Sequence, residues 1–154
     1  MRRKEKEIFE ESAIETVIRK SIVCRLGMVD GDKPYIVPLC FGYKDRAIYV
    51  HGSLKGKRIN AIKKNNSVCF EFDINSEIIE AEKACDWGMK FQSVIGFGKA
   101  ILIDDPDEKR RALDIIMRQY SDSFFQYPAG LIEKTSLIKI EIESMSGKQS
   151  GFNK

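Results

Sequence analysis

One short segment gathers the side chains and the backbone freedom that an anion site requires. It contains two glycines, one serine and three cations, namely Gly52, Ser53, Lys55, Gly56, Lys57 and Arg58. Glycine lets the backbone approach a ligand closely, and the apolar pattern from Ile59 onward predicts a short helix whose free N–H groups favour anions. The segment therefore predicts a phosphate site. Its spacing is not that of a Walker A loop, and a solvated basic helix start remains the alternative on these residues alone.

Other catalytic chemistries find few candidates. His51 is the one histidine of the chain, and no Cys/His cluster surrounds it, so we expect no zinc or other metal site. A Ser-His-Asp or Cys-His nucleophile would depend on that same histidine, and no G-x-S-x-G elbow is present. The four cysteines form no C-x-x-C pair. We expect them to be reduced, with three packing as small apolar side chains within strands.

Length and charge narrow the classes further. The 154 residues carry a net charge of +3 and are expected to form one domain over 1–154. This charge is too small for a dedicated nucleic-acid binder, and no apolar run approaches the roughly 20 residues that span a bilayer. We expect no secretory signal at the N-terminus, because no apolar core follows its charged residues. We therefore expect a cytoplasmic protein that binds neither nucleic acid nor a membrane.

The elements that would position the loop are mainly strands. Period-two patterns separated by turn residues predict six strands, at 22–29, 35–43, 47–51, 67–73, 91–103 and 136–142, the fifth bent at Gly96 and Gly98. Helices are expected at about 12–20, at 59–64 and after Asp105, while 74–90 has no clear period and a C-terminal tail occupies about 145–154. This order favours an antiparallel sheet closed into a small barrel with flanking helices.

Two residues interrupt the strand patterns. Pro38 cannot donate a ladder hydrogen bond, which assigns its strand to a sheet edge or marks a bulge. Arg25 is a charge in an otherwise apolar strand. It either extends to the surface or neutralises a buried anion, and both interpretations stay open.

Four blocks of sequence resemble the pyridoxamine 5′-phosphate oxidase-like flavin-binding split barrels, and more narrowly their nitroimidazole-resistance (Nim-type) branch. The blocks are Val37–Tyr43, Ile48–Arg58, Val68–Glu71 and Cys85–Ala100. The resemblance runs from about Arg2 to Lys148 and keeps the order and spacing of all four blocks.

The resemblance implies a six-stranded antiparallel split β-barrel that forms a homodimer, with FMN, or FAD in its place, at two sites built from both subunits. It implies a phosphate next to Ser53, Lys55, Lys57 and Arg58 of the glycine-containing loop and a flavin ring along the backbone of three consecutive residues, Val37, Pro38 and Leu39. The other subunit would contribute residues between Trp87 and Val94, including Ser93. Trp87 is either a stacking partner of the ring or an ordinary interface aromatic.

His51 matches a histidine that lies close to the flavin in the Nim-type branch. The resemblance implies either a proton donor or a hydrogen bond that orients the substrate, whereas the residue alone is equally typical of a polar strand end.

The resemblance also guides the expected function. True pyridoxamine-phosphate oxidases end in an arginine-rich segment, which the segment Ser146–Lys154 lacks, so vitamin B6 oxidation is not expected. The remaining enzymatic interpretation is an FMN-dependent oxidoreductase that reduces small electron-poor organic compounds such as nitroaromatics. The alternative is a carrier or sensor that binds flavin or haem with little turnover.

Overall fold

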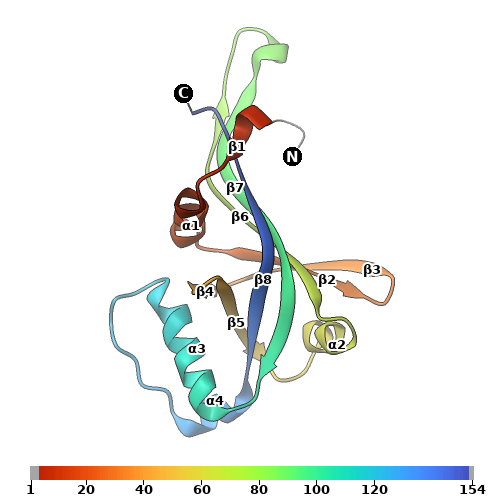
Figure 1. Ribbon diagram of the computed structural model, residues 1–154, viewed down its shortest axis with the longest axis vertical. Coiled ribbons are helices and arrows are strands. Elements are labelled where there is room, and N and C mark those ends of the chain that lie inside the picture. Colours follow the sequence, from red (N-terminus) through yellow and green to blue (C-terminus); the bar gives the residue numbers. More distant parts are fainter. Residues whose placement is uncertain (1–3, 153–154) are drawn as a thin grey trace.

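A computed structural model describes residues 4–152, which form one antiparallel sheet with helices packed around it (Figure 1). The strands are β1 (Glu7–Ile8), β2 (Cys24–Asp30), β3 (Lys33–Leu39), β4 (Phe41–Lys44), β5 (Ala47–Ser53), β6 (Ser67–Ile79), β7 (Gly88–Ile103) and β8 (Thr135–Ser150). The α-helices are α1 (Glu11–Lys20), α2 (Lys57–Lys64), α3 (Pro106–Arg118) and α4 (Ala129–Lys134), and two 3-10 turns are η1 (Lys4–Lys6) and η2 (Ala84–Asp86).

The strand path explains how the sheet forms a split barrel. Its order is β3-β2-β6-β7-β8-β5-β4, with β1 paired to the far end of β8. The run expected as one strand over 35–43 is divided at Cys40, because β3 pairs with β2 at one end of the path and β4 pairs with β5 at the other. The chain thus joins the two ends of the sheet at Cys40. The predicted fold class is confirmed, and the described residues hold eight strands rather than six because of this division and β1.

Pro38 occupies the position that its chemistry predicts. It pairs with Arg25 of β2, and within residues 4–152 no strand pairs with the other side of β3. The missing N–H of proline costs no ladder hydrogen bond at such an edge. The backbone of 37–39 therefore remains available to something other than a strand.

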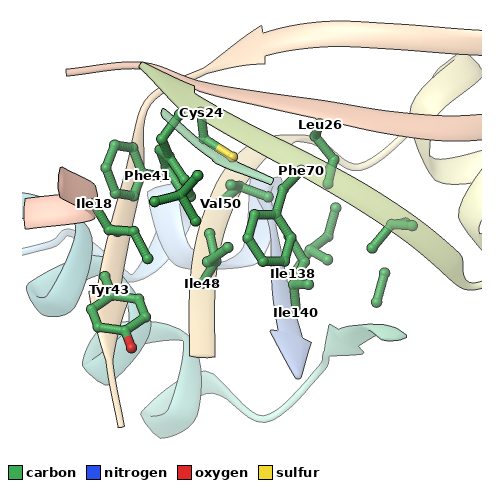
Figure 2. Close-up of a cluster of buried hydrophobic side chains, with 14 of the residues drawn as sticks. Ile18, Cys24, Leu26, Phe41, Tyr43, Ile48, Val50, Phe70, Ile138 and Ile140 are labelled. Carbon is green, nitrogen blue, oxygen red and sulfur yellow. The ribbon is translucent and has the colours of Figure 1, made fainter. Parts of the chain in front are cut away.

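The main core lies inside the curved sheet and is closed by α1. Figure 2 shows Ile18 of α1 with side chains from β2, β4, β5, β6 and β8, among them Leu26, Phe41 and Phe70. The ring centroids of Phe41 and Phe72 are 4.7 Å apart. Burial of these aromatic rings packs β4, at one end of the strand path, against β6 across the core.

A second core fixes the start of β8. It consists of Ile103, Ala112, Leu113, Ile116, Ile132 and Leu137, contributed by β7, α3, α4 and β8. Helix α3 begins as predicted, with Asp105 Oδ2 accepting a hydrogen bond from the Glu108 N–H at 2.9 Å and Pro106 in the first turn.

The segment 74–90 differs from the expected irregular stretch. β6 and β7 continue beyond the barrel as a hairpin, here called the arm (residues 74–92), which projects at the top of Figure 1 and is closed by η2. Ile78 and Ile79 are both exposed. The outer part of the arm covers no core, so neither of its faces requires apolar side chains. The sequence therefore lacks the two-residue hydrophobic period of a half-buried strand there.

The last strand also exceeds its expected length. β8 continues past Ile142 to Ser150, because its far half pairs with β7 from Phe91 to Phe97 and with β1. Most of the expected tail over 145–154 is therefore strand, and its last residues, 153–154, lie outside the described residues. Near the bend expected at Gly96 and Gly98, the pairing of β7 with β8 shifts register between Phe97 and Gly98, where Glu143 of β8 has no partner in β7.

The cysteines and Arg25 are placed more simply than expected. All four thiols are free, and of the three expected to pack as apolar side chains within strands only Cys24 is buried, so the expectation is wrong for Cys40 and Cys69, while Cys85 is exposed on the arm. Arg25 reaches the outer face of the sheet, where it pairs with Glu71 at 3.0 Å and with Asp73. No helix within residues 4–152 is long and apolar enough to cross a membrane.

Candidate functional site

A cavity of about 320 Å³ lies where the edge of β3, the end of β5 and the start of α2 meet. Its lining consists of Tyr35, Val37, Pro38, Leu39, Ser53, Lys55, Gly56, Lys57, Arg58 and Ile59. Eight of these ten residues were selected from the sequence. The structure thus joins the edge strand and the glycine-containing loop, which are separated by β4 and β5 along the chain.

The loop has the local geometry of an anion site. Gly56 has φ 131° and precedes α2, a conformation that disfavours every residue except glycine. Helix α2 has no side-chain cap, so its first N–H groups are directed outward without an intrahelical acceptor. The Lys55 N–H donates to Ser53 Oγ at 3.3 Å. We call Ser53–Arg58 the cradle.

Arg58 extends inward from α2. Its Nη2 donates to the His51 carbonyl at 3.2 Å. It occupies the space that a Cβ at Gly52 would fill. Its Nε is buried and has no hydrogen-bond partner within residues 4–152. A buried guanidinium N–H without an acceptor is costly, and it indicates that the arginine is prepared for an acceptor that arrives from outside the chain.

The other two cations of the cradle are not equivalent. Lys57 Nζ lies 3.2 Å from Asp30 Oδ2 and 4.6 Å from the centroid of the Tyr35 ring. It therefore connects the β2–β3 turn to the start of α2. Lys55 is exposed and makes no ion pair within the part of the chain that the structure describes. Lys55 and Arg58 are thus the cations that an incoming anion could engage without competition from a carboxylate.

His51 lies beside the cavity rather than in its lining. It pairs with Leu137 across β5 and β8, and its carbonyl holds Arg58. Partial burial, and after it the positive charge of Arg58, lower the pKa of His51 below its ordinary value of 6.5. The imidazole is therefore neutral at neutral pH, where it can donate or accept a hydrogen bond.

The three candidates from the fourth sequence block are not in this cavity. Trp87 lies on the arm, is 50% exposed and donates from Nε1 to the Ala81 carbonyl at 2.7 Å. Ser93 is half-buried and pairs with Asp73 and Lys148. Val94 is fully buried in the core between β6 and β8. In the single chain Val94 therefore presents no surface to a ligand, and the contribution of Trp87, Ser93 and Val94 to a site shared between subunits stays a prediction.

Sequence reasoning missed Tyr35 and Asp30. Tyr35 lines the cavity together with Val37 and Leu39, two and four residues further along the same strand. Because side chains two apart share a face of a strand, that spacing was a usable signal. The contact between Asp30 and Lys57 depends on tertiary packing and had no local signal.

The chain is similar in sequence to one known family. The sequence model described as pyridoxamine 5′-phosphate oxidase matches residues 10–149. Among curated protein sequences, none matches significantly.

Several solved structures share the fold. One, named as a candidate 5-nitroimidazole antibiotic resistance protein from Bacteroides thetaiotaomicron, has 33% identity, a TM-score of 0.84, and coverage of 92% of this chain and 85% of its own. The flavocytochrome Anf3 from Azotobacter vinelandii has 20% identity, a TM-score of 0.87, and coverage of 99% and 72%. An FAD and heme binding protein from Mycobacterium smegmatis has 17% identity, a TM-score of 0.87, and coverage of 97% and 76%.

Proposed function

Because the chain belongs to the pyridoxamine 5′-phosphate oxidase family, in its nitroimidazole-resistance branch, we propose that it binds FMN and uses it to reduce small electron-poor organic compounds such as nitroaromatics. The observation that carries the proposal is the unpartnered, buried Nε of Arg58 beside the exposed Lys55 and the start of α2. A phosphate monoester with close to two negative charges would supply the acceptor that these donors lack.

The residues fit the two ends of a flavin mononucleotide. The cradle would hold the phosphate, with Arg58 and Lys55 as its main partners and Lys57 as a weaker one because Asp30 competes for it. The backbone of Val37, Pro38 and Leu39 would face the edge of the ring, since β3 has a free edge there. A bound FMN would supply the electron transfer, and the protein would supply orientation and exclusion of water.

We assign His51 the role of orienting the substrate by a hydrogen bond. Its lowered pKa disfavours the imidazolium at neutral pH, so a neutral ring that donates one N–H fits better than a charged proton donor. A cytoplasmic location belongs to the same proposal, since four free thiols persist in a reducing compartment.

Titration of FMN, FAD and riboflavin onto the flavin-free protein tests the proposal. FMN is expected to bind about 10- to 10,000-fold more tightly than riboflavin, since one to two charge-assisted contacts to phosphate each contribute about 1.5–3 kcal/mol. FMN-dependent consumption of NAD(P)H with a nitroaromatic acceptor would then support the reductase, and binding without turnover would support a carrier or sensor. Equal affinities for FMN and riboflavin would contradict the phosphate site.

A homodimer completes the proposal. The outer face of β2, β3 and β7 exposes Val29, Ile36, Ile95 and Phe97, with exposed fractions between 38% and 63%, and a cavity of about 610 Å³ on this face has an almost wholly apolar lining. Large exposed apolar patches are typical of interaction surfaces. A second copy on this face could also bring an arm, with Trp87, to the edge of β3.

Light scattering is expected to give twice the monomer mass of 17.6 kDa at micromolar concentration. Ile36→Asp, which places a charge at the most exposed of these apolar residues, should give the monomer, whereas Lys63→Asp on the exposed surface of α2 should leave the dimer intact. A flavin-bound monomer of the unaltered protein would exclude a site shared between subunits.

The pKa of His51 provides an independent check of the site. Since the chain has one histidine, its NMR titration is assigned without ambiguity. We expect a midpoint below 6.5 in the flavin-free protein, and a higher midpoint in Arg58→Met because removal of the neighbouring positive charge favours protonation. A midpoint that does not move in Arg58→Met would place the guanidinium away from His51.

A further inference from the structure

A buried hydroxyl lies directly behind the cradle. Ser136, the second residue of β8, is 5% exposed. Its Oγ donates a hydrogen bond to the Ser53 carbonyl at 2.8 Å. A buried hydroxyl group lowers the free energy of unfolding unless it forms a hydrogen bond. Here the acceptor of that hydrogen bond belongs to the first residue of the cradle.

Ser53 is the point at which the chain leaves the sheet. It is the last residue of β5 and pairs with Thr135, the first residue of β8. Beyond Ser53 the cradle has no strand partner, and its next internal contact is the 3.3 Å bond from the Lys55 N–H to Ser53 Oγ. The orientation of Ser53 therefore determines the position of Lys55 and of the first residue of α2.

The strand end that carries Ser136 is itself held by a buried cation. Lys109 of α3 is 8% exposed, and its Nζ donates to the carbonyls of Thr135 at 2.9 Å and Ile132 at 3.3 Å. No carboxylate pairs with Lys109 within residues 4–152; its ammonium is satisfied by main-chain oxygens at the end of α4 and the start of β8. A rigid connection thus runs from α3 through the start of β8 to Ser53.

We propose that Ser136 is a positioning residue for the phosphate of the flavin: its hydroxyl fixes the Ser53 carbonyl, so that the cradle is already in its binding conformation before the ligand arrives. Preorganisation of this kind lowers the ordering cost of binding. Ser136 itself is covered by Ser53 and does not line the cavity. The inference rests on the proposed function for its ligand, while the effect on the cradle is a property of the flavin-free chain.

The matched pair Ser136→Thr and Ser136→Val tests this role. The two side chains have the same shape and both suit a strand, so any strain from the added methyl group is common to both and the difference reports the hydroxyl. Thr16→Val, which removes an exposed hydroxyl that donates to the Ser12 carbonyl in α1, is the control for loss of a hydroxyl elsewhere.

Two measurements are compared. In the flavin-free proteins, amide hydrogen exchange over 53–58 should be about three- to tenfold faster in Ser136→Val than in Ser136→Thr. FMN binding should be weaker in Ser136→Val by a similar factor, whereas riboflavin binding, which needs no phosphate contact, should differ by less than about twofold. Thr16→Val should match the unaltered protein in both measurements.

The outcomes separate the two levels of inference. If the unaltered protein prefers FMN but Ser136→Thr and Ser136→Val have the same exchange rates and FMN affinities, the positioning role is wrong and the proposed function stands. If Ser136→Val weakens riboflavin as much as FMN, the hydroxyl supports the fold rather than the phosphate cradle, and the role is again wrong. If the unaltered protein binds FMN and riboflavin equally, the proposed function fails and the role of Ser136 toward a phosphate fails with it.

Discussion

Arg58→Met is expected to weaken FMN binding about 10- to 100-fold and to change riboflavin binding by less than about twofold. The guanidinium is half-buried, directed into the site, and has one N–H without an acceptor. Charge-assisted hydrogen bonds to a phosphate contribute about 1.5–3 kcal/mol, and about 1.4 kcal/mol corresponds to tenfold in affinity. Methionine keeps an unbranched apolar side chain, so the change removes the charge and the donors with little loss of packing.

Lys63→Met is the matched control for Arg58→Met. Lys63 lies on the same helix, is exposed, and carries the same charge outside the cradle. Lys63→Met should lower FMN affinity by less than about twofold, and this small effect should disappear at high salt because exposed charges are screened. If the two variants weakened FMN binding equally, only the overall charge of α2 would matter and the directed role of Arg58 would be refuted.

The sequence was sufficient for the composition of the cradle and for the edge strand that faces it. Glycine at 56 indicated a special backbone conformation, which the structure shows as a positive φ, and Pro38 restricted its strand to a sheet edge or a bulge, of which the structure shows the edge. Both signals are local, because they depend on the backbone chemistry of one residue. The barrel class followed from the alternation of short strands, which is also a local pattern.

The direction of each cation could not be obtained in the same way. Successive residues of a helix differ by about 100°, so the sequence leaves open whether Lys57 or Arg58 points inward. The choice depends on Asp30, which lies 27 positions before Lys57 and attracts it, and on the open space above Gly52, which accepts Arg58. Both contacts depend on tertiary packing, so no local sequence pattern predicts them.

The burial of Val94 depends on strand register, which the sequence alone did not determine. Val94 was selected because it lies in a block that resembles flavin-binding relatives, but alternation alone does not say which face of β7 is the core face. The register places Val94 opposite Phe72 and Gly147 in the core, and Gly96, Gly98 and Ala100 continue the same buried face along β7. A one-residue change of register would have exposed Val94 instead.

Gly52→Ala is expected to lower FMN affinity as much as Arg58→Met, although alanine carries no charge and Gly52 does not line the cavity. A Cβ at position 52 would overlap the guanidinium of Arg58, whose end is the flexible part of the contact. The arginine side chain would therefore move out of the site while the backbone stays in place. We expect a melting temperature within a few degrees of the unaltered protein, since no backbone atom is displaced.

The double variant tests whether Gly52 acts only through Arg58. If Gly52 acts only by admitting Arg58, Gly52→Ala combined with Arg58→Met should bind FMN about as well as either single variant, because the second change removes a contact that the first has already removed. Gly130→Ala, at an exposed helical glycine with open space around it, controls for loss of glycine and should leave FMN affinity unchanged. Additive losses in the double variant would show that alanine at 52 disturbs the cradle by a route that does not pass through Arg58.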